Sequence, residues 1–379
     1  MADKNINARK KIIESCGSVI VKVGTRLLTE PALIPLLVSH ITKLRARGKK
    51  VLLVSSGAVG LGIKTLGLSS RPKKLAAVQG LAAIGQSKLM GRYQEACEAE
   101  GFIAAQLLLT MADLRDRKRH LNVLNCINEL WARNVLPIVN ENDTVSVDEL
   151  KFGDNDILSG FIATMTKSEL TIILTTTDGF HEMKDGEIGP RIPLVEKVTR
   201  KLYGYASGTD SSVFSIGGMR SKLKAAEMVT SFGEHLLIAD GRDPGIMDKI
   251  LAGDDVGTLF LPLQEKMQSR KRWIGLFSHP RGKIFIDKGA AEALLKKGSS
   301  LLPSGMVGAE GLFRTGDPVE ICLEGGELVA RGLANFGSAD CNRIAGLHSS
   351  ELEKVLPDAG TVEEVVHRNN LFVYSKNES

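Results

Sequence analysis

A chain of 379 residues exceeds what one hydrophobic core usually serves, so the length predicts two domains. Hydrophobic residues at 43% and charged residues at 25% are ordinary for a soluble globular protein, and no apolar run approaches the roughly 20 residues of a membrane span. The net charge of +5 does not by itself indicate nucleic acid, because the residues from Lys266 onward hold 15 Lys and Arg against 14 Asp and Glu.

The cysteines and the N-terminus predict a compartment. The five cysteines are scattered and form no CxxC pair, which argues against a disulfide framework or a zinc site and for a reducing environment. Residues 1–11 are polar and basic with no apolar segment behind them, so no signal peptide is predicted. We therefore expect a cytoplasmic protein without membrane contact.

The first two thirds of the chain alternate apolar, β-branched runs with helical patterns, which is typical of βαβ units and a mostly parallel sheet. The apolar runs lack strict alternation, as strands covered on both faces should. The predicted strands are Val19–Val23, Val51–Ser55, Phe102–Leu109, Val135–Val139, Leu170–Thr175 and His235–Ala239, and helices are predicted at about Leu33–Leu44, Lys73–Glu100 and Asp113–Arg133.

The pattern changes after about Gly253. From Arg272 onward, short alternating segments (GKIFID, GDPVEICL, GGELVARGL) are cut by glycines and prolines, and they predict a small, mainly β domain. The polar stretch Leu263–Arg270 is the predicted boundary. We expect domains at residues 14–262 and 272–370.

Each strong motif of the first domain sits at the carboxyl end of a predicted strand, where open α/β sheets bind their ligands. The first is Val21-Lys22-Val23-Gly24-Thr25. A lysine inside an apolar strand is costly to bury unless it meets an anion, but an edge lysine whose amine reaches water also fits. Gly24 would let a phosphate approach backbone N–H groups, which favours an anion site.

The second motif is Ser55-Ser56-Gly57-Ala58-Val59-Gly60-Leu61-Gly62. It matches neither a P-loop, which ends in Gly-Lys-Ser/Thr, nor a dinucleotide fingerprint, which needs a third glycine where Thr65 stands. A flexible strand-to-helix turn remains an alternative. We expect an oxyanion-binding turn that uses the N–H groups of Ser56 and Gly57.

The third motif is a pair of polar clusters, Asn140-Glu141-Asn142-Asp143 and Gly153-Asp154-Asn155-Asp156, at the two ends of one loop. An N-cap at Asp154 or Asn155 accounts for one residue but not for both clusters. Asp and Asn together suit an amino acid, because carboxylates accept from an ammonium group and amides bond to either end. A metal site is the rival reading, but hard-cation sites usually have a tighter ligand spacing, so no metal ligands are predicted.

The fourth motif, Gly217-Gly218-Met219-Arg220-Ser221-Lys222, opens a predicted helix that runs to Phe232. Two glycines followed by a helix N-terminus form a site for the terminal phosphate of a nucleotide. A plain helix start is the alternative, but a lysine in the first turn opposes the helix dipole and so favours a ligand.

These motifs, in this order, resemble the glutamate 5-kinase family of the amino acid kinase superfamily. Arg270-Lys271-Arg272-Trp273-Ile274, Asp287-x-Gly289-Ala290, Gly298-x-Ser300-Leu301-Leu302-Pro303 and Gly316-Asp317 resemble the PUA domain at the C-terminus of that family. The resemblance covers nearly the whole chain. It implies an α/β fold, a three-layer α/β/α sandwich with a mostly parallel sheet, followed by a small mainly-β PUA domain.

The resemblance also implies roles for single residues. By that comparison Lys22 and Lys222 flank the transferred phosphoryl group, Asp156 positions the two lysines, and the substrate contacts are Ser56, Gly57, Asn140, Asp143 and Asn155. The implied ATP contacts are Lys22, Gly24, Thr175, Thr176, Ile216, Gly217, Gly218, Met219, Arg220, Ser221 and Lys222. Ile216 and Thr176 depart from the family, which usually has Thr and Asp there.

The implied reaction is ATP-dependent phosphorylation of the γ-carboxylate of L-glutamate, with Mg²⁺ on the ATP phosphates, as the first step of proline biosynthesis. A carboxylate is already ionised at neutral pH, so no general base is needed, and the motifs offer lysines and N–H groups but no obvious histidine. The family implies a homo-oligomer, a tetramer, and inhibition by proline.

Two alternatives stay open. A sister kinase could act on N-acetylglutamate, aspartate, carbamate or a nucleotide, although the cluster Asn140–Asp143 favours a free ammonium group. An RNA-binding protein could act through the PUA-like domain, with the basic run Arg270-Lys271-Arg272 as a contact, but the near-neutral charge of that domain argues against RNA as its main partner.

Overall fold

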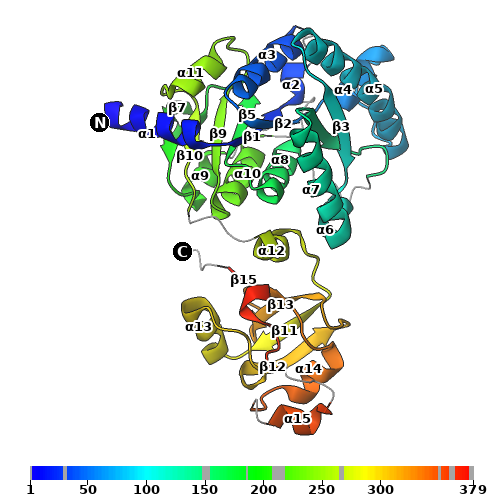
Figure 1. Cartoon of the computed structure of the whole chain (residues 1–379), viewed down its shortest axis with the longest axis vertical. Helices are drawn as coiled ribbons and strands as arrows, with labels where there is room; N and C mark the ends of the chain where they lie inside the picture. The colour runs from blue at the N-terminus through cyan, green and yellow to red at the C-terminus, as the bar shows by residue number, and fades with distance from the viewer. Residues whose placement is uncertain are drawn as a thin grey trace. The chain divides into compact units, whose positions relative to one another are not determined.

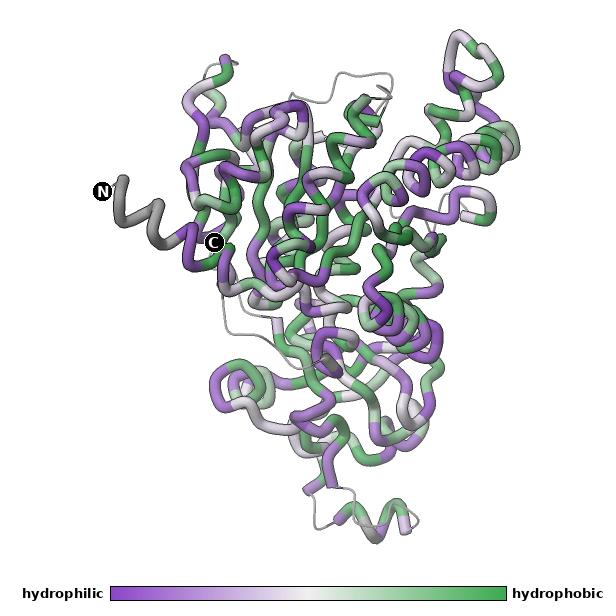
Figure 2. The backbone as a smooth tube through the Cα atoms, turned by 45° about the horizontal axis from the view of Figure 1, so that its top comes forward, coloured by the Kyte–Doolittle hydropathy of each residue, from purple (hydrophilic) through white to green (hydrophobic). Residues whose placement is uncertain are grey.

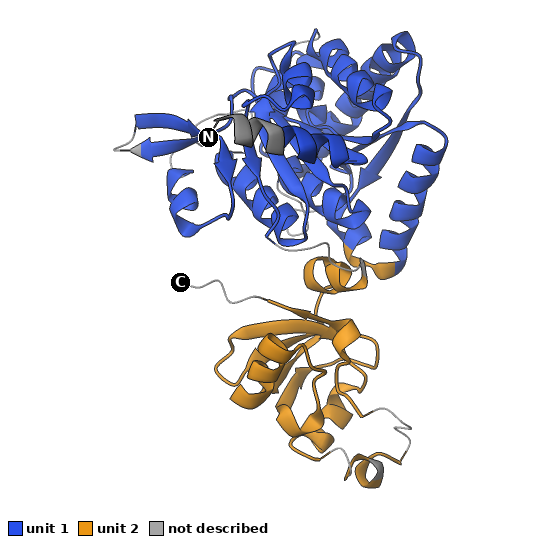
Figure 3. Cartoon of the chain, turned by 60° about the vertical axis from the view of Figure 1, so that its left-hand side comes forward, with its two compact units in different colours: residues 1–114, 118–266 blue, residues 115–117, 267–379 orange. Residues whose placement is uncertain are grey.

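The computed structural model describes residues 2–28, 32–146, 154–184, 187–206, 218–263, 269–348, 351–357 and 363–374. The chain separates into two compact units, one formed by residues 1–114 and 118–266 and the other by residues 115–117 and 267–379 (Figure 3). Each unit has its own sheet.

The elements up to residue 266 alternate strands and helices, as the apolar runs predicted. The strands are β1 (Ser18–Val23), β2 (Lys50–Val54), β3 (Ala104–Leu109), β4 (Leu136–Glu141), β5 (Leu170–Thr175), β6 (Phe180–Lys184), β7 (Glu187–Ile192), β8 (Leu194–Val195), β9 (His235–Asp240) and β10 (Thr258–Phe260). The helices are α1 (Ala2–Ser15), α2 (Thr25–Leu28), α3 (Leu33–Ala46), α4 (Ala58–Thr65), α5 (Leu75–Ala99), α6 (Met111–Arg115), α7 (Arg117–Ala132), α8 (Asn155–Thr166), α9 (Arg200–Tyr205), α10 (Met219–Ser231) and α11 (Ile246–Ala252).

Among the described residues, eight strands form the large sheet, in the order β3-β4-β2-β1-β5-β9-β10-β8. The pairs from β3 to β9 are all parallel, and β10 runs antiparallel to β9. The six strands predicted from the apolar runs are the six parallel ones, so the mostly parallel sheet is confirmed. Their carboxyl ends meet at one edge of the sheet.

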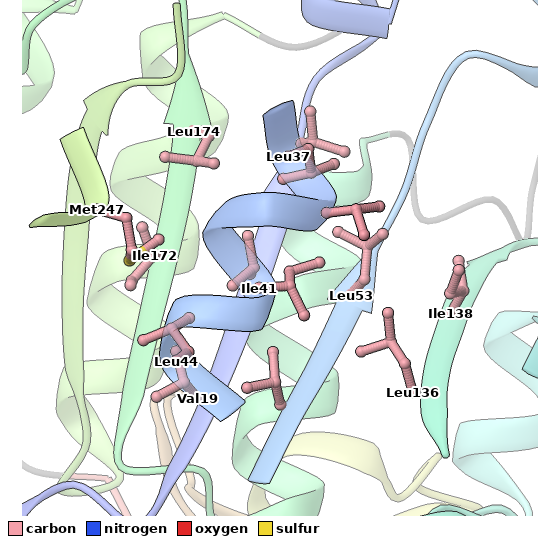
Figure 4. Close-up of a cluster of buried hydrophobic side chains, with 14 of the residues drawn as sticks. Val19, Leu37, Ile41, Leu44, Leu53, Leu136, Ile138, Ile172, Leu174 and Met247 are labelled. Carbon is pink, nitrogen blue, oxygen red and sulfur yellow. The ribbon is translucent and has the colours of Figure 1, made fainter. Parts of the chain in front are cut away.

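Helices cover both faces of this sheet, which makes three layers (Figure 1). The side chains of β1 alternate between the faces: Val19, Val21 and Val23 join the core that packs against α3, whereas Lys22 points the other way, toward α8. Figure 4 shows the α3 side of this core, with Ile41 and Leu44 of the helix lying over the strands. In Figure 2 the central strands are mostly hydrophobic and the outer helices mix polar and apolar residues, as a buried parallel sheet requires.

The helices follow the predictions with one difference. The stretch predicted as one helix at Asp113–Arg133 is divided into α6 and α7 at Asp116. Thr110 begins α6, because its N–H and hydroxyl donate to the Asp113 carboxylate at 2.8 and 2.6 Å. That local capping gives the first turn a separate start from α7.

The second unit contains a mixed sheet. Its strands are β11 (Gly282–Ile286), β12 (Met306–Gly311), β13 (Pro318–Leu323), β14 (Leu328–Leu333) and β15 (Leu371–Val373), and its helices are α12 (Ser269–Arg272), the π-helix η2 (Trp273–Phe277), α13 (Lys288–Lys297), α14 (Ser338–Ile344), α15 (Leu352–Val355) and the 3₁₀ turns η3 (Pro303–Gly305) and η6 (Arg368–Asn370). The sheet order is β12-β11-β13-β14-β15. The three alternating segments read from the sequence form β11, β13 and β14, which confirms the small, mainly-β second fold.

Two expectations from composition can be compared with the structure. No helix in the described ranges is both long enough and apolar enough to cross a membrane. All five cysteines lie in the described ranges; each is free there, and Cys126 alone is exposed.

Candidate active site

A buried carboxylate joins the two lysines of the first and fourth motifs. Asp156, in the first turn of α8, has no exposed surface; its Oδ1 lies 2.5 Å from Lys22 Nζ and its Oδ2 lies 2.9 Å from Lys222 Nζ. Lys22 comes from β1, between β2 and β5, and Lys222 comes from the start of α10. The edge-lysine alternative for Lys22 is therefore wrong: the strand is central and the amine meets an anion.

The charges of this cluster support one another. Burial alone would raise the pKa of Asp156, but the adjacent Lys22 and Lys222 outweigh burial and hold its pKa well below the usual range. Burial alone would lower the pKa of Lys22, but Asp156 and Asp154 raise it above the ordinary value. Asp156 and Lys22 therefore remain ionised at neutral pH.

Asp154 supplies a second carboxylate to the same place. It is the N-cap of α8, and its Oδ1 accepts from the Asp156 N–H at 3.0 Å and lies 3.9 Å from Lys22 Nζ. Its Oδ2 is buried and accepts no hydrogen bond of normal geometry from the described residues. Burial and the charge of Asp156 raise the pKa of Asp154, although Lys22 and Ser221 act in the opposite direction.

The third motif forms a network of side-chain amides. Asn155 Nδ2, which carries two hydrogens, lies within hydrogen-bond distance of three acceptors: Ser55 O at 2.7 Å, Ser56 Oγ at 2.8 Å and Asn140 Oδ1 at 2.9 Å. Asn140, at the carboxyl end of β4, donates in turn from Nδ2 to Gln86 Oε1 at 2.8 Å. The network therefore ties the second motif to both clusters of the third.

The glycine turn after β2 begins α4. Gly57 has φ of +94°, a conformation that favours glycine, and it is the N-cap of α4. The next helix packs very closely on this turn, because a Cβ on Gly85 would lie 1.8 Å from Ala58 O. The backbone of the turn is therefore held by α5, and the first N–H groups of α4 remain without intrahelical partners.

A cavity of about 490 Å³ opens over these groups at the carboxyl edge of the sheet. Ten of the sequence-predicted residues line it: Lys22, Gly24, Ser56, Gly57, Asn140, Asp143, Asn155, Thr175, Thr176 and Lys222. Lys22 and Lys222 bring positive charge to the wall, and Asn155 and Asp143 bring an amide and a carboxylate. Such a wall can bind one ligand rich in phosphate oxygens and a second that carries an ammonium group.

The remaining predicted residues lie elsewhere. Asp156 lies beneath the cavity wall and contacts it through the two lysines, and Ser221 donates to Asp156 Oδ2 at 3.0 Å or to Gly218 O at 2.8 Å. Gly218, Met219 and Arg220 begin α10 without lining the cavity. Ile216 and Gly217 lie outside the described residues.

Two groups that line the cavity, and one residue that reaches it only through Asn140, were not predicted from the sequence. Asp154 was considered only as an N-cap, although it stands beside Asp156 in the third motif. Gln86 lies in the middle of a long helix with no local signal. The other group consists of Arg26, Lys64 and Arg71, which line the cavity on the side of α2 and α4.

Comparison with known proteins agrees with this fold. Residues 17–240 match the model of the amino acid kinase family, and residues 282–356 match the model of the PUA domain. The chain therefore belongs to the amino acid kinase family, and it carries a PUA domain after the kinase fold.

Its relatives specify the resemblance further. A glutamate 5-kinase from Desulfotalea psychrophila is 43% identical over 376 residues, with 97% of this chain and 99% of the relative covered. A glutamate 5-kinase from Geobacter sulfurreducens is 42% identical over 366 residues, with 96% and 97% covered. Among solved structures, the carbamate kinase from Giardia lamblia bound to AMP-PNP matches 66% of this chain and 99% of its own, with a TM-score of 0.48 and 18% identity.

Proposed function

We propose that the protein transfers the γ-phosphoryl group of ATP to the side-chain carboxylate of L-glutamate and releases L-glutamyl 5-phosphate and ADP, the first step of proline biosynthesis. One observation carries the proposal: Lys22 and Lys222 meet on the buried Asp156 at the wall of a cavity that also holds Asn155 and Asp143. Relatives named glutamate 5-kinase, matched over nearly their whole length, support the same acceptor.

The chemistry asks the protein for charge and alignment. The attacking carboxylate is already ionised, so its oxygen can form the new P–O bond without losing a proton. Lys22 and Lys222 neutralise the negative charge on the phosphoryl group during transfer, and Asp156 holds the two ammonium groups toward one point. In this mechanism Asp156 is a positioning residue and the two lysines are catalytic.

The glutamate side of the cavity is assigned to the third motif and the glycine turn. Asn155 and Asp143 bind the α-ammonium and α-carboxylate groups, assisted by Asn140, while Ser56 and the N–H of Gly57 offer donors to a carboxylate. A free ammonium group would meet the oxygens of Asp143 and Asn155. An acetylated nitrogen carries no positive charge and would lose this match.

The ATP side is assigned to the carboxyl ends of β1 and β5. Gly24 lies against Lys22, since a Cβ there would be 3.7 Å from Lys22 Nζ, and Thr175 and Thr176 line the same cavity. The residues from Ile216 to Ser221 are proposed to complete the phosphate site. Thr176 stands where the family usually has Asp, so the nucleotide contact there rests on a hydroxyl group.

A divalent metal ion accompanies ATP in kinases, and we propose Mg²⁺. Mg²⁺ is usually held by one or two carboxylates together with phosphate oxygens. Asp154 fits that need, because it lines the cavity and its buried Oδ2 accepts no hydrogen bond of normal geometry from the described residues. When bound, the ion would neutralise phosphate charge beside the lysines.

The domain limits, at residues 14–262 for the kinase and 272–370 for the PUA domain, belong to the same proposal. Assembly into a homo-oligomer, inhibition by proline and any RNA contact of the PUA domain stay predictions from the family resemblance.

The acceptor is tested by ADP release with ATP and a panel of acids: glutamate, N-acetylglutamate, aspartate and carbamate. Trapping the product with hydroxylamine checks that an acyl phosphate forms. We expect turnover with glutamate and at least about a hundredfold lower kcat/KM with N-acetylglutamate, because the acceptors in the cavity would lose their ammonium partner. Equal turnover of these two acids would overturn the assignment of Asp143 and Asn155.

A further inference from the structure

Gln86 is a buried polar side chain that no sequence motif includes. It lies near the middle of α5, a helix of 25 residues, with 9% of its surface exposed. Its Oε1 accepts from Nδ2 of Asn140, which is 2% exposed, at 2.8 Å. A hydrogen bond between two buried amides across 54 positions of sequence needs both partners in fixed orientations.

Two backbone groups determine those orientations. Asn155 Nδ2 faces the carbonyl oxygen of Ser55 at 2.7 Å, and a carbonyl can only accept, so the amide nitrogen of Asn155 must be on that side. The oxygen of Asn140 accepts from the N–H of Glu141 at 2.9 Å, and a backbone N–H can only donate. Asn140 therefore presents its oxygen to Asn155 and its nitrogen to Gln86.

The role of Gln86 follows from this order. Asn140 Nδ2 is a donor in a buried place, so Gln86 must offer an acceptor, its Oε1. With Asn140 held, its oxygen keeps Asn155 Nδ2 turned inward, and Asn155 Oδ1 receives no hydrogen bond from the residues that the structure describes. That oxygen is then available as an acceptor for an ammonium group in the cavity that Asn155 lines.

We propose that Gln86 is a positioning residue for the amino-acid substrate: by accepting from Asn140 it holds the Asn140–Asn155 pair in the orientation that the backbone groups allow, and so favours acceptors with a free ammonium group. This inference rests on the proposed function, since it concerns recognition of the glutamate α-ammonium group. Gln86 touches neither substrate nor nucleotide in this scheme.

The test compares two changes at one position. Gln86→Leu removes the acceptor and leaves the Asn140 amide unpaired, so KM for glutamate should rise about tenfold to a hundredfold while KM for ATP stays near that of the unaltered protein. Gln86→Glu keeps an acceptor oxygen at the same distance from the backbone and should recover most of the glutamate KM. A general loss of packing would raise the KM values for glutamate and ATP alike, and it would do so in both Gln86→Leu and Gln86→Glu.

Two further variants of α5 serve as controls. Gln94→Leu makes the same change at an exposed position of the helix, and it should leave both KM values unchanged. Leu89→Ala opens a cavity in the core on α5 and should lower the melting temperature without raising KM for glutamate selectively.

The outcomes separate the two proposals. If the unaltered protein neither phosphorylates glutamate nor gains thermal stability from it, the proposed function is wrong and the inference falls with it. If the unaltered protein uses glutamate and Gln86→Leu has the same glutamate KM, or if Leu89→Ala raises that KM as much as Gln86→Leu does, only the inference is overturned.

Discussion

The change Asp156→Asn tests the centre of the site, because it removes one buried negative charge and leaves its two positive partners. Lys22 and Lys222 lie 2.5 and 2.9 Å from the carboxylate oxygens, and all three side chains are nearly inaccessible to water. At an effective dielectric constant of about 20, each contact is worth roughly 6–7 kcal/mol before the cost of desolvation. The cost of removing these charges from water offsets most of this attraction. Because Asp156→Asn leaves two buried ammonium groups with one partner fewer, we expect the free energy of unfolding to fall by about 3–5 kcal/mol.

The double variant Asp156→Asn/Lys222→Met tests whether the buried charges are coupled. Removing Lys222 together with the carboxylate leaves Lys22 opposite Asp154, at 3.9 Å, so the buried charges balance again. We expect the double variant to lose about 1–3 kcal/mol less free energy of unfolding than the two single variants lose together. It also keeps the test informative if Asp156→Asn alone does not fold.

The assays are urea unfolding followed by circular dichroism and steady-state ADP release with glutamate. Asp156→Asn and Lys222→Met should each lower kcat by about a hundredfold or more, since one preorganised charge is lost or misplaced. Stability losses that add within about 0.5 kcal/mol would show that the charges are not coupled. A Lys222→Met enzyme with normal kcat and only a raised KM would refute the catalytic role of that lysine.

Three further predictions concern packing, pH and domain function. Gly85→Ala should lower the free energy of unfolding by at least about 2 kcal/mol and raise KM for glutamate, because its Cβ would lie 1.8 Å from Ala58 O. Gly91→Ala, in open space on the same helix, should instead stabilise the protein by about 0.5–1 kcal/mol. Equal shifts in melting temperature for the two variants would contradict this prediction. Burial lowers the pKa of His40 to about 4, so on acidification the unfolded chain binds the proton before the folded chain does. The free energy of unfolding should therefore fall by up to about 3 kcal/mol between pH 6.5 and pH 4. In urea titrations His40→Leu should lose this dependence of stability on pH. A chain ending at Gln264 should retain glutamate-dependent ADP release, and a folded but inactive truncation would overturn the assignment of activity to the first unit.

Much of the fold was readable from local patterns. Apolar runs without alternation marked the six parallel strands, because a strand buried on both faces needs apolar residues at consecutive positions. The order of strands and helices then placed the polar motifs at one sheet edge, since parallel strands end on the same side. For that reason the cavity-lining positions of Lys22, Gly57 and Asn155 were among the residues proposed from sequence.

The partners of these residues were not readable in the same way. Asp154 and Asp156 stand in one motif with the same chemistry, and the local pattern alone does not say which of the two lies between the lysines. The family resemblance assigned that place to Asp156, and the packing of α8 against β1 and α10 puts it there. The two side chains leave the start of α8 in different directions, so only Asp156 reaches both lysines.

Gln86 and His40 show the same limit more strongly. Each lies on a helix whose local sequence gives no reason for a buried polar group, and each takes its character from neighbours on other elements. Local sequence determines periodicity, turns and caps, because those depend on residues a few positions apart. Charge pairing, amide orientation and burial depend on which helix face meets which strand, and only the packed tertiary structure decides that.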